Sequence, residues 1–275
     1  MKHLLLTTIA AVVLVGCGES QQSTPSPETK PDEPVAEVPA PPAPSEANPA
    51  EPVAEAAKTK PLAAKAPDIS ILDAVSAGNV DVVKMYLSDG LDLNLKYEQW
   101  FSTTLLHRAV AADQEEIVKL LIDRGADVNA KDINSNAPLS LTGIHGNVSV
   151  ADLLVSSGAD LNYKGFGGWT PLHMAAFKGQ MHLVNYLVSR KGAEVEIKDD
   201  GGTTALHCAA FKGHNNVINF LFLKDANVNA MGDQGTTPLD AAIEGGQDES
   251  ATLIRSIGGM TFEELKAEYS TRIRA

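Results

Sequence analysis

Three histidines, His107, His173 and His207, have the side chain and the recurring spacing that suggest a metal site, because neutral imidazole is a common zinc ligand. His207 is also followed directly by Cys208, and an imidazole beside a thiol is the pair that cysteine nucleophiles use. Whether these groups can meet depends on the secondary-structure elements that carry them.

The histidines belong to a short motif that recurs five times in register. Its fullest form, Thr-Pro-Leu-His, stands at Thr170 to His173. A second motif, Gly-Ala-Asp-Val-Asn at Gly125 to Asn129, closes each unit in related forms. Such a period indicates a repeat architecture in which each unit packs only on its neighbours. The motif leucines follow one another at steps of 33, 33, 34 and 33 residues: Leu106, Leu139, Leu172, Leu206 and Leu239.

Each motif position has a physical role in a helix-turn-helix unit. The threonine is suited to cap a first helix, and a proline in the first turn needs no amide partner. A glycine seven residues after most of the leucines, such as Gly179, allows the chain to reverse into a second helix. That helix carries apolar residues at helical spacing, as in Ile117, Val118, Leu120 and Leu121.

With these two motifs the units resemble ankyrin repeats. The resemblance covers residues 68–260, about 70% of the chain. It implies an all-α ankyrin-repeat solenoid of about six helix-turn-helix repeats. Ankyrin folds bind unrelated targets, so the fold does not name the partner. The expected repeats are 68–97, 102–132, 133–164, 165–199, 200–231 and 232–260.

The third repeat departs most from the pattern. Ala137 replaces the capping threonine, Ser140 replaces the histidine, and Gly143 stands inside the first helix. A glycine inside a helix costs ~1 kcal/mol relative to alanine. We therefore expect this repeat to be the least stable, and Gly143→Ala to raise the midpoint of unfolding.

A C-terminal capping helix is expected at residues 261–275. Thr261 followed by Glu264 is typical of a capping box at a helix start. We expect this helix to cover the core of the last repeat, with a docking helix for a partner as the alternative. Its apolar residues share one stripe: Phe262, Leu265, Tyr269 and Ile273.

The repeats argue against chemistry at the histidines. Stacked helices lie about 8–10 Å apart, so equivalent side chains cannot readily share a zinc ion. In ankyrin repeats this histidine hydrogen-bonds within the turn network. Adjacent residues on a helix point in different directions, so His207 and Cys208 make a poor base and nucleophile. We therefore predict a protein that is not an enzyme and has no catalytic residue, metal or cofactor.

The N-terminus is typical of a targeting signal. The uncharged stretch Leu4 to Val15 is too short for a bilayer span of about 20 residues. Leu14 to Cys17, Leu-Val-Gly-Cys, resembles a bacterial lipobox, in which the signal is removed and the cysteine is acylated. The resemblance implies a signal peptide at 1–16 and a lipid on Cys17; an ordinary cleaved signal or an uncleaved anchor is the alternative. In lipoproteins of this kind an Asp directly after the cysteine favours retention in the inner membrane. Gly18 stands there instead, so the resemblance implies the outer membrane, with the protein facing the periplasm or the cell surface.

Residues 17–67 are expected to form a disordered tether. Twelve of the fifteen prolines lie between Pro25 and Pro67, with one leucine and no aromatic residue, so this segment cannot offset its ordering entropy by burial. Its prolines favour an extended spacer that holds the repeats away from a membrane. The formal charge of −13 argues against nucleic acid as a partner. We expect a monomer that touches the membrane through its lipid.

A partner surface follows from the resemblance, since the turn tips and the exposed side of the first helices bind partners in this family. Phe177-Lys178 and Phe211-Lys212 occupy identical positions and should form a two-rung ladder. Exposed aromatic groups often act as hot spots, although rings at these positions can also pack between repeats. The selected residues are Trp100, Phe101, Phe166, Trp169, Met174, Phe177, Lys178, Phe211 and Lys212.

These features predict a lipid-anchored module of the bacterial envelope that binds another protein. One alternative is a structural or spacer lipoprotein without a specific partner. Another is an accessory subunit of an envelope enzyme. A continuous exposed aromatic patch on the concave face favours binding, whereas a uniformly charged face favours a spacer.

Overall fold

The computed structural model describes residues 69–98, 101–190 and 193–274. The expected signal peptide and tether lie outside the described residues. Within them the fold is all-α, as predicted, with six helix pairs and a C-terminal helix, α14 (Phe262–Arg274). The pairs are α2 (Ile71–Ser76) with α3 (Val80–Ser88), α4 (Leu105–Ala111) with α5 (Glu115–Asp123), α6 (Pro138–His145) with α7 (Val148–Ser156), α8 (Pro171–Phe177) with α9 (Met181–Ser189), α10 (Ala205–Lys212) with α11 (Asn215–Leu223), and α12 (Pro238–Glu244) with α13 (Asp248–Ser256).

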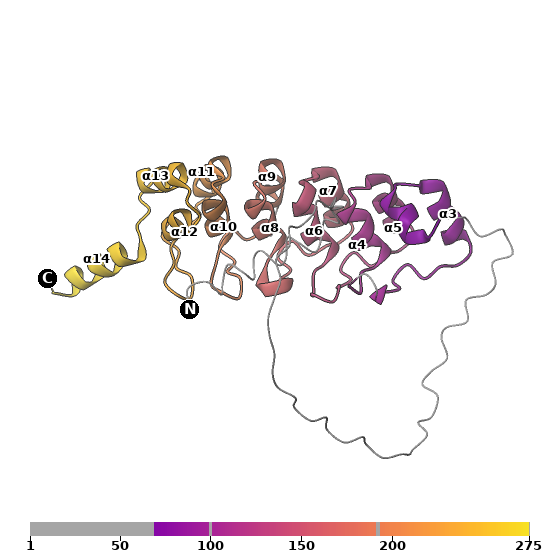
Figure 1. Cartoon of the computed structure of the whole chain (residues 1–275), viewed down its shortest axis with the longest axis horizontal. Coiled ribbons are helices and arrows are strands. Elements are labelled where there is room, and N and C mark those ends of the chain that lie inside the picture. Colours follow the sequence, from indigo (N-terminus) through magenta and orange to yellow (C-terminus); the bar gives the residue numbers. More distant parts are fainter. Residues whose placement is uncertain (1–68, 99–100, 191–192, 275) are drawn as a thin grey trace, which may run out of the picture.

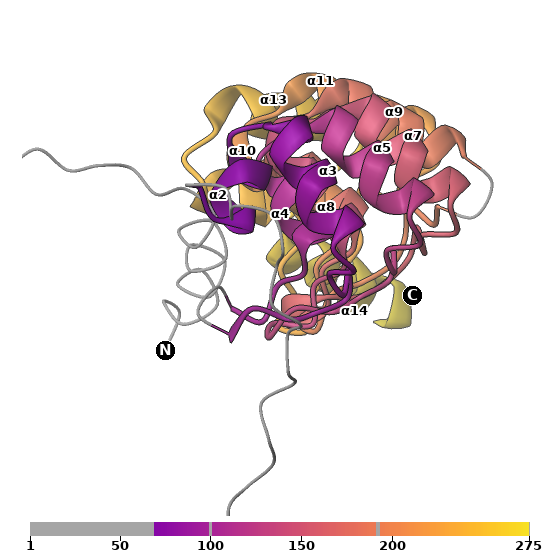
Figure 2. The same ribbon diagram turned by 90° about the vertical axis from the view of Figure 1, so that its right-hand side faces the viewer.

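The helix pairs stack in two rows (Figure 1). The first helices of the pairs form an inner row, the second helices form an outer row, and the turns project on the side away from the outer row. Figure 2, a view along the stack, shows the turns gathered at one edge of the solenoid. No helix among the described residues is long and apolar enough to cross a membrane.

The motif leucines form the continuous core between the two rows. Each of the five is at most 3% exposed. Alanines such as Ala175, Ala176, Ala209 and Ala210 are fully buried on the inner helices, where small side chains let neighbouring helices approach closely. Every repeat therefore completes the core of the next, which explains why the sequence period extends without interruption.

The motif histidines are structural links between repeats, as the resemblance implies. The backbone N–H of each capping threonine donates to histidine Nδ1 at 3.2–3.3 Å, so the ring proton lies on Nε2. Nε2–H donates at 2.9–3.0 Å to a carbonyl of the following turn: His107 to Asn136, His173 to Thr203, and His207 to Thr236. Burial lowers the pKa of all three histidines, that of His207 to about 4.

The last repeat uses an aspartate at the histidine position because it meets a different neighbour. The carboxylate of Asp240 accepts the backbone N–H of Thr237 at 3.1 Å and that of Phe262 at 2.8 Å. The segment after the last repeat thus presents a backbone N–H donor, whereas the turns after the histidine-containing repeats present a carbonyl acceptor. Asp240 therefore ties the start of α14 to the solenoid.

In the third repeat the structure explains one of the three departures, the glycine inside α6. Ala137 caps α6 without a side-chain hydrogen bond, and Ser140 Oγ is buried without a partner among the described residues. Gly143 is helical, but a Cβ atom there would lie 2.9 Å from Met174 Cβ and 3.1 Å from the backbone nitrogen of Ala175. The space for a Cβ atom that the sequence-based prediction for Gly143→Ala assumed is already occupied by Met174, so we now expect this substitution to destabilise the protein.

Helix α14 begins as predicted, but it covers less of the solenoid. Thr261 N–H donates to Glu264 Oε2 at 2.8 Å, and Glu264 N–H donates to Thr261 Oγ1 at 3.3 Å. Phe262 is half-buried, with its ring against Gly235. Tyr269 and Ile273 remain 69% and 70% exposed, so the expected cover holds for the first turns only, and the rest of α14 extends from the stack (Figure 1).

Candidate functional site

The nine side chains selected from the sequence differ in exposure. Trp100 lies outside the described residues. The expectation of exposure is wrong for Trp169, Met174 and Phe177, which are only 8%, 7% and 6% exposed. Phe101 and Lys212 are exposed, and the half-buried ones are Phe166, Lys178 and Phe211.

Trp169 and Phe177 are buried because they pack on each other along α8. Trp169 directly precedes the capping Thr170 and has an extended backbone, whereas His173 and Phe177 are four residues apart on one face of α8. The indole meets the Phe177 ring edge to face, with centroids 5.3 Å apart, and lies 6.2 Å from the His173 ring. This aromatic cluster is part of the buried core of the fourth repeat.

Lys212 joins the two phenylalanines of neighbouring inner helices. Its Nζ lies 4.6 Å from the centroid of Phe177 on α8 and 5.5 Å from that of Phe211 on α10. Both distances allow cation–π attraction. The Phe-Lys ladder is thus a connected surface in which Lys212 and part of Phe211 face solvent, while Phe177 forms the floor.

The turn tips form a second line along the solenoid. Backbone hydrogen bonds link neighbouring tips, for example from Ile133 N–H to the Phe101 carbonyl at 2.9 Å and from Asp233 N–H to the Gly201 carbonyl at 3.0 Å. The tips of the early repeats are apolar, with Phe101 49% and Ile133 65% exposed. Asp200 and Asp233 give the later tips an acidic character.

A row of lysines beside the tips was not fully recognised from the sequence. Lys131, Lys164 and Lys198 are exposed and stand at one repeat position, two residues after the end of the Gly-Ala-Asp-Val-Asn motif or its variants. Lys164 Nζ donates to the Lys198 carbonyl at 2.7 Å, and Lys198 Nζ donates to the Met231 carbonyl at 2.9 Å. Lys131 Nζ lies 4.8 Å from the centroid of Tyr163. The repeat register was the signal that could have revealed this row.

A family model described as "Ankyrin repeats (3 copies)" matches residues 71–165, 139–231 and 172–260. The chain belongs to the ankyrin-repeat family. The fold of this family is in general a non-catalytic interaction module, so binding to another protein is the role that the repeats support.

Curated relatives share single stretches of ankyrin repeats with this chain. The 2-5A-dependent ribonuclease of Mus musculus is 38% identical over 77 residues, which are 28% of this chain and 10% of the relative. Ankyrin repeat-containing protein P1E11.10 of Schizosaccharomyces pombe is 35% identical over 66 residues, 24% of this chain and 31% of the relative. Because the matches span less than a third of each relative, their similarity concerns the repeats and not the whole proteins.

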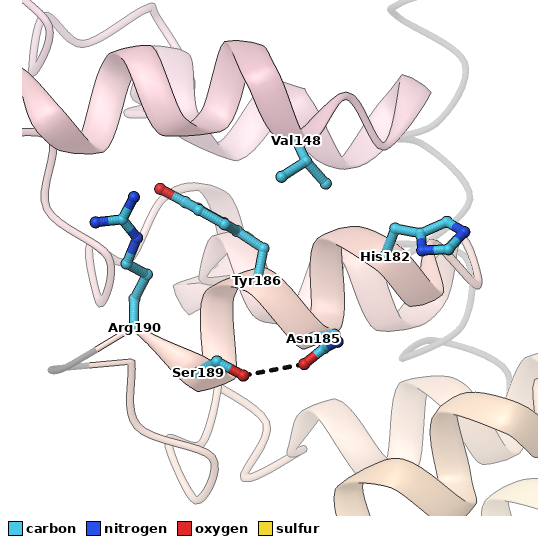
Figure 3. Close-up of a pocket in the computed structure, with 6 residues that line it drawn as sticks. All are labelled: Val148, His182, Asn185, Tyr186, Ser189 and Arg190. Carbon is cyan, nitrogen blue, oxygen red and sulfur yellow. Dashed lines mark hydrogen bonds between the residues drawn. The ribbon is translucent and has the colours of Figure 1, made fainter.

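The outer face of the ankyrin repeats has a shallow depression between α7 and α9 (Figure 3). Asp152 on α7 accepts a hydrogen bond from the Tyr186 hydroxyl at 2.8 Å and pairs with Arg190. His182 lies apart from this group in Figure 3. The contacts of Asp152 tie α7 to α9 and its C-terminal end, and Ser189 Oγ donates to Asn185 Oδ1 at 2.9 Å within α9.

Cys208 is a buried thiol within the repeats. Burial raises its pKa far above the ordinary value, so it stays protonated and unreactive. Both nitrogens of His207 are engaged with backbone groups, which leaves none to act as its base. The described residues contain no group of three or more side chains suited to a metal ion.

Proposed function

We propose that the ankyrin repeats bind another protein along the inner helices and turn tips, through Phe211, Lys178 and Lys212 with Phe101 and Phe166. The contact of Lys212 with two phenyl rings carries this proposal. It presents apolar and cationic groups side by side across two repeats, the combination found at protein interfaces. A spacer without a partner has no need of such a surface.

The proposal extends to the N-terminus. Cys17 carries a lipid, and residues 17–67 hold the repeats away from a membrane of the bacterial envelope, facing the periplasm or the cell surface. The Leu-Val-Gly-Cys sequence and the proline content support this arrangement. Two or more acyl chains are needed for stable anchoring.

Site-specific photo-crosslinking in cells tests the binding surface. A photoreactive phenylalanine at position 211 should form a discrete adduct with another protein. The same residue at Phe222, which is 36% exposed on the outer helix α11, is the matched control and should not. Equal labelling from both positions, or none from position 211, would contradict a specific partner and favour the spacer.

Metabolic labelling with an alkyne fatty acid tests the anchor. The label should be lost in Cys17→Ser and retained in Cys208→Ser, since the second cysteine is buried. Label that persists in Cys17→Ser, or that never appears in the parent, rules out lipidation at this residue.

A further inference from the structure

Five lysines near the proposed binding surface form no ion pair with a carboxylate of the described residues. Lys178 and Lys212 occupy one repeat position at the ends of α8 and α10. Lys131, Lys164 and Lys198 form the turn row described above. The ion pairs among the described residues lie elsewhere, between α7 and the end of α9, between α13 and α14, and within α14. In a chain of formal charge −13 these five lysines form two cationic rows, and Asp200 and Asp233 also lie in the later turns.

The two rows border the inner helices at opposite ends. Each inner helix begins at its turn and ends at the mid-repeat reversal, so the turn row lies near its start and Lys178 or Lys212 at its end. A helix of seven or eight residues is about 11–12 Å long. The inner-helix surface between the rows is therefore about one segment wide, and Phe211 and the Phe177 ring lie at its Lys178 and Lys212 end.

We propose that the protein partner presents an acidic, extended segment, bound across α8 and α10 between the two lysine rows. This inference rests on the proposed function and specifies the partner's chemistry. Neighbouring inner helices stack about 8–10 Å apart. In an extended polyproline-type chain every third residue shares a face, about 9 Å along the segment. Carboxylates three residues apart can thus reach Lys178 and Lys212 in turn, while an apolar residue between them contacts Phe211.

The overall charge of the chain favours such a segment over other polyanions. Nucleic acid and anionic membranes present many charges, which the net charge of −13 repels at long range. A short peptide carries few charges and meets the lysine rows locally, within a Debye length of about 8 Å at physiological salt.

Fluorescence polarisation with the full chain tests the proposal with defined probes. Labelled twelve-residue peptides would carry glutamate, glutamine or lysine at every third position among prolines and leucines. The glutamate peptide should bind, and the other two should bind at least about threefold more weakly. Lys178→Gln with Lys212→Gln should weaken its binding about three- to tenfold. The control, Lys119→Gln with Lys224→Gln, removes two exposed outer-row charges and should leave binding within about twofold.

Three results would overturn the proposal. The first is equal binding of the glutamate and glutamine peptides, and the second is a loss of binding in the control pair as large as that in Lys178→Gln with Lys212→Gln. Duplex DNA or phosphatidylglycerol vesicles could also bind more tightly than the peptide and depend on Lys178 and Lys212, which would assign the rows to another polyanion. A specific adduct from position 211 together with the first result leaves the proposed function standing and rejects the acidic segment.

Discussion

Gly143 on α6 lies against the side chain of Met174 on α8. A Cβ atom at position 143 would come within 2.5 Å of Met174 Cγ and 2.9 Å of Met174 Cβ. The glycine that looks like a helix defect is therefore the small half of a contact between two repeats. Its low helix propensity is offset by the burial of Met174, which is only 7% exposed.

Gly143→Ala is expected to destabilise the solenoid by about 1–3 kcal/mol, because the added methyl group overpacks a filled interface. Urea unfolding followed by circular dichroism measures the change. Met174→Ala should recover part of the loss when combined with Gly143→Ala, since it removes the Cγ contact. A higher unfolding midpoint for Gly143→Ala alone would contradict this account.

Ala137→Thr should stabilise the third repeat by about 1 kcal/mol. Ala137 has the extended backbone of the other caps, with φ −90° and ψ 158°, but no side-chain hydrogen bond to α6. Thr170, in the equivalent place with φ −91° and ψ 166°, accepts the His173 N–H. The control Thr170→Ala should lower stability by a similar amount in the same urea titration. No gain from Ala137→Thr would show that the missing cap is not what weakens this repeat.

Phe177→Ala and Phe211→Ala should differ in their effect on folding. Phe177 is 6% exposed and packs on Trp169, so its truncation should cost about 3–5 kcal/mol of unfolding free energy. Phe211 is half-buried, so Phe211→Ala should lower the free energy of unfolding by clearly less. Separate urea titrations of the two variants measure this difference. Equal losses would mean that Phe211 belongs to the core and is a poor candidate for a partner contact.

Stability should fall between pH 7.5 and pH 5 because of the buried histidines. Burial holds the pKa of His207 at about 4, below the value of about 6.5 in an unfolded chain, so the unfolded state binds more protons between these values. The contribution of the neutral, buried His207 to the free energy of unfolding is complete above pH 6.5 and is lost as the pH falls towards 4. For His207 alone the loss at pH 5 is about 2 kcal/mol. Urea unfolding at both pH values should show a smaller difference in His207→Gln than in the parent, and an unchanged difference would refute the assignment.

The local features of the fold were predictable because they depend on residues close together in the chain. Capping by Thr170, reversal near Gly179 and the motif leucines such as Leu172 follow from backbone geometry and a repeated period. The period also implies that each unit needs a neighbour to bury its core. Sequence alone therefore determined the all-α solenoid, and the resemblance to ankyrin repeats implied the structural role of His173.

Side-chain exposure was decided by the tertiary structure, because it depends on which residues of the next repeat fill the space. Phe177 and Phe211 occupy one motif position, yet Phe177 is covered by Trp169 and Lys212 while Phe211 remains half-buried. From the sequence, Gly143 suggests an unstable helix, whereas the structure shows the side chain of Met174 packed against it. Gly143 and Met174 belong to different repeats, as do Phe177 and Lys212, whereas Trp169 and Phe177 lie in one repeat. In each case helical periodicity carries no information about how two particular side chains share one volume.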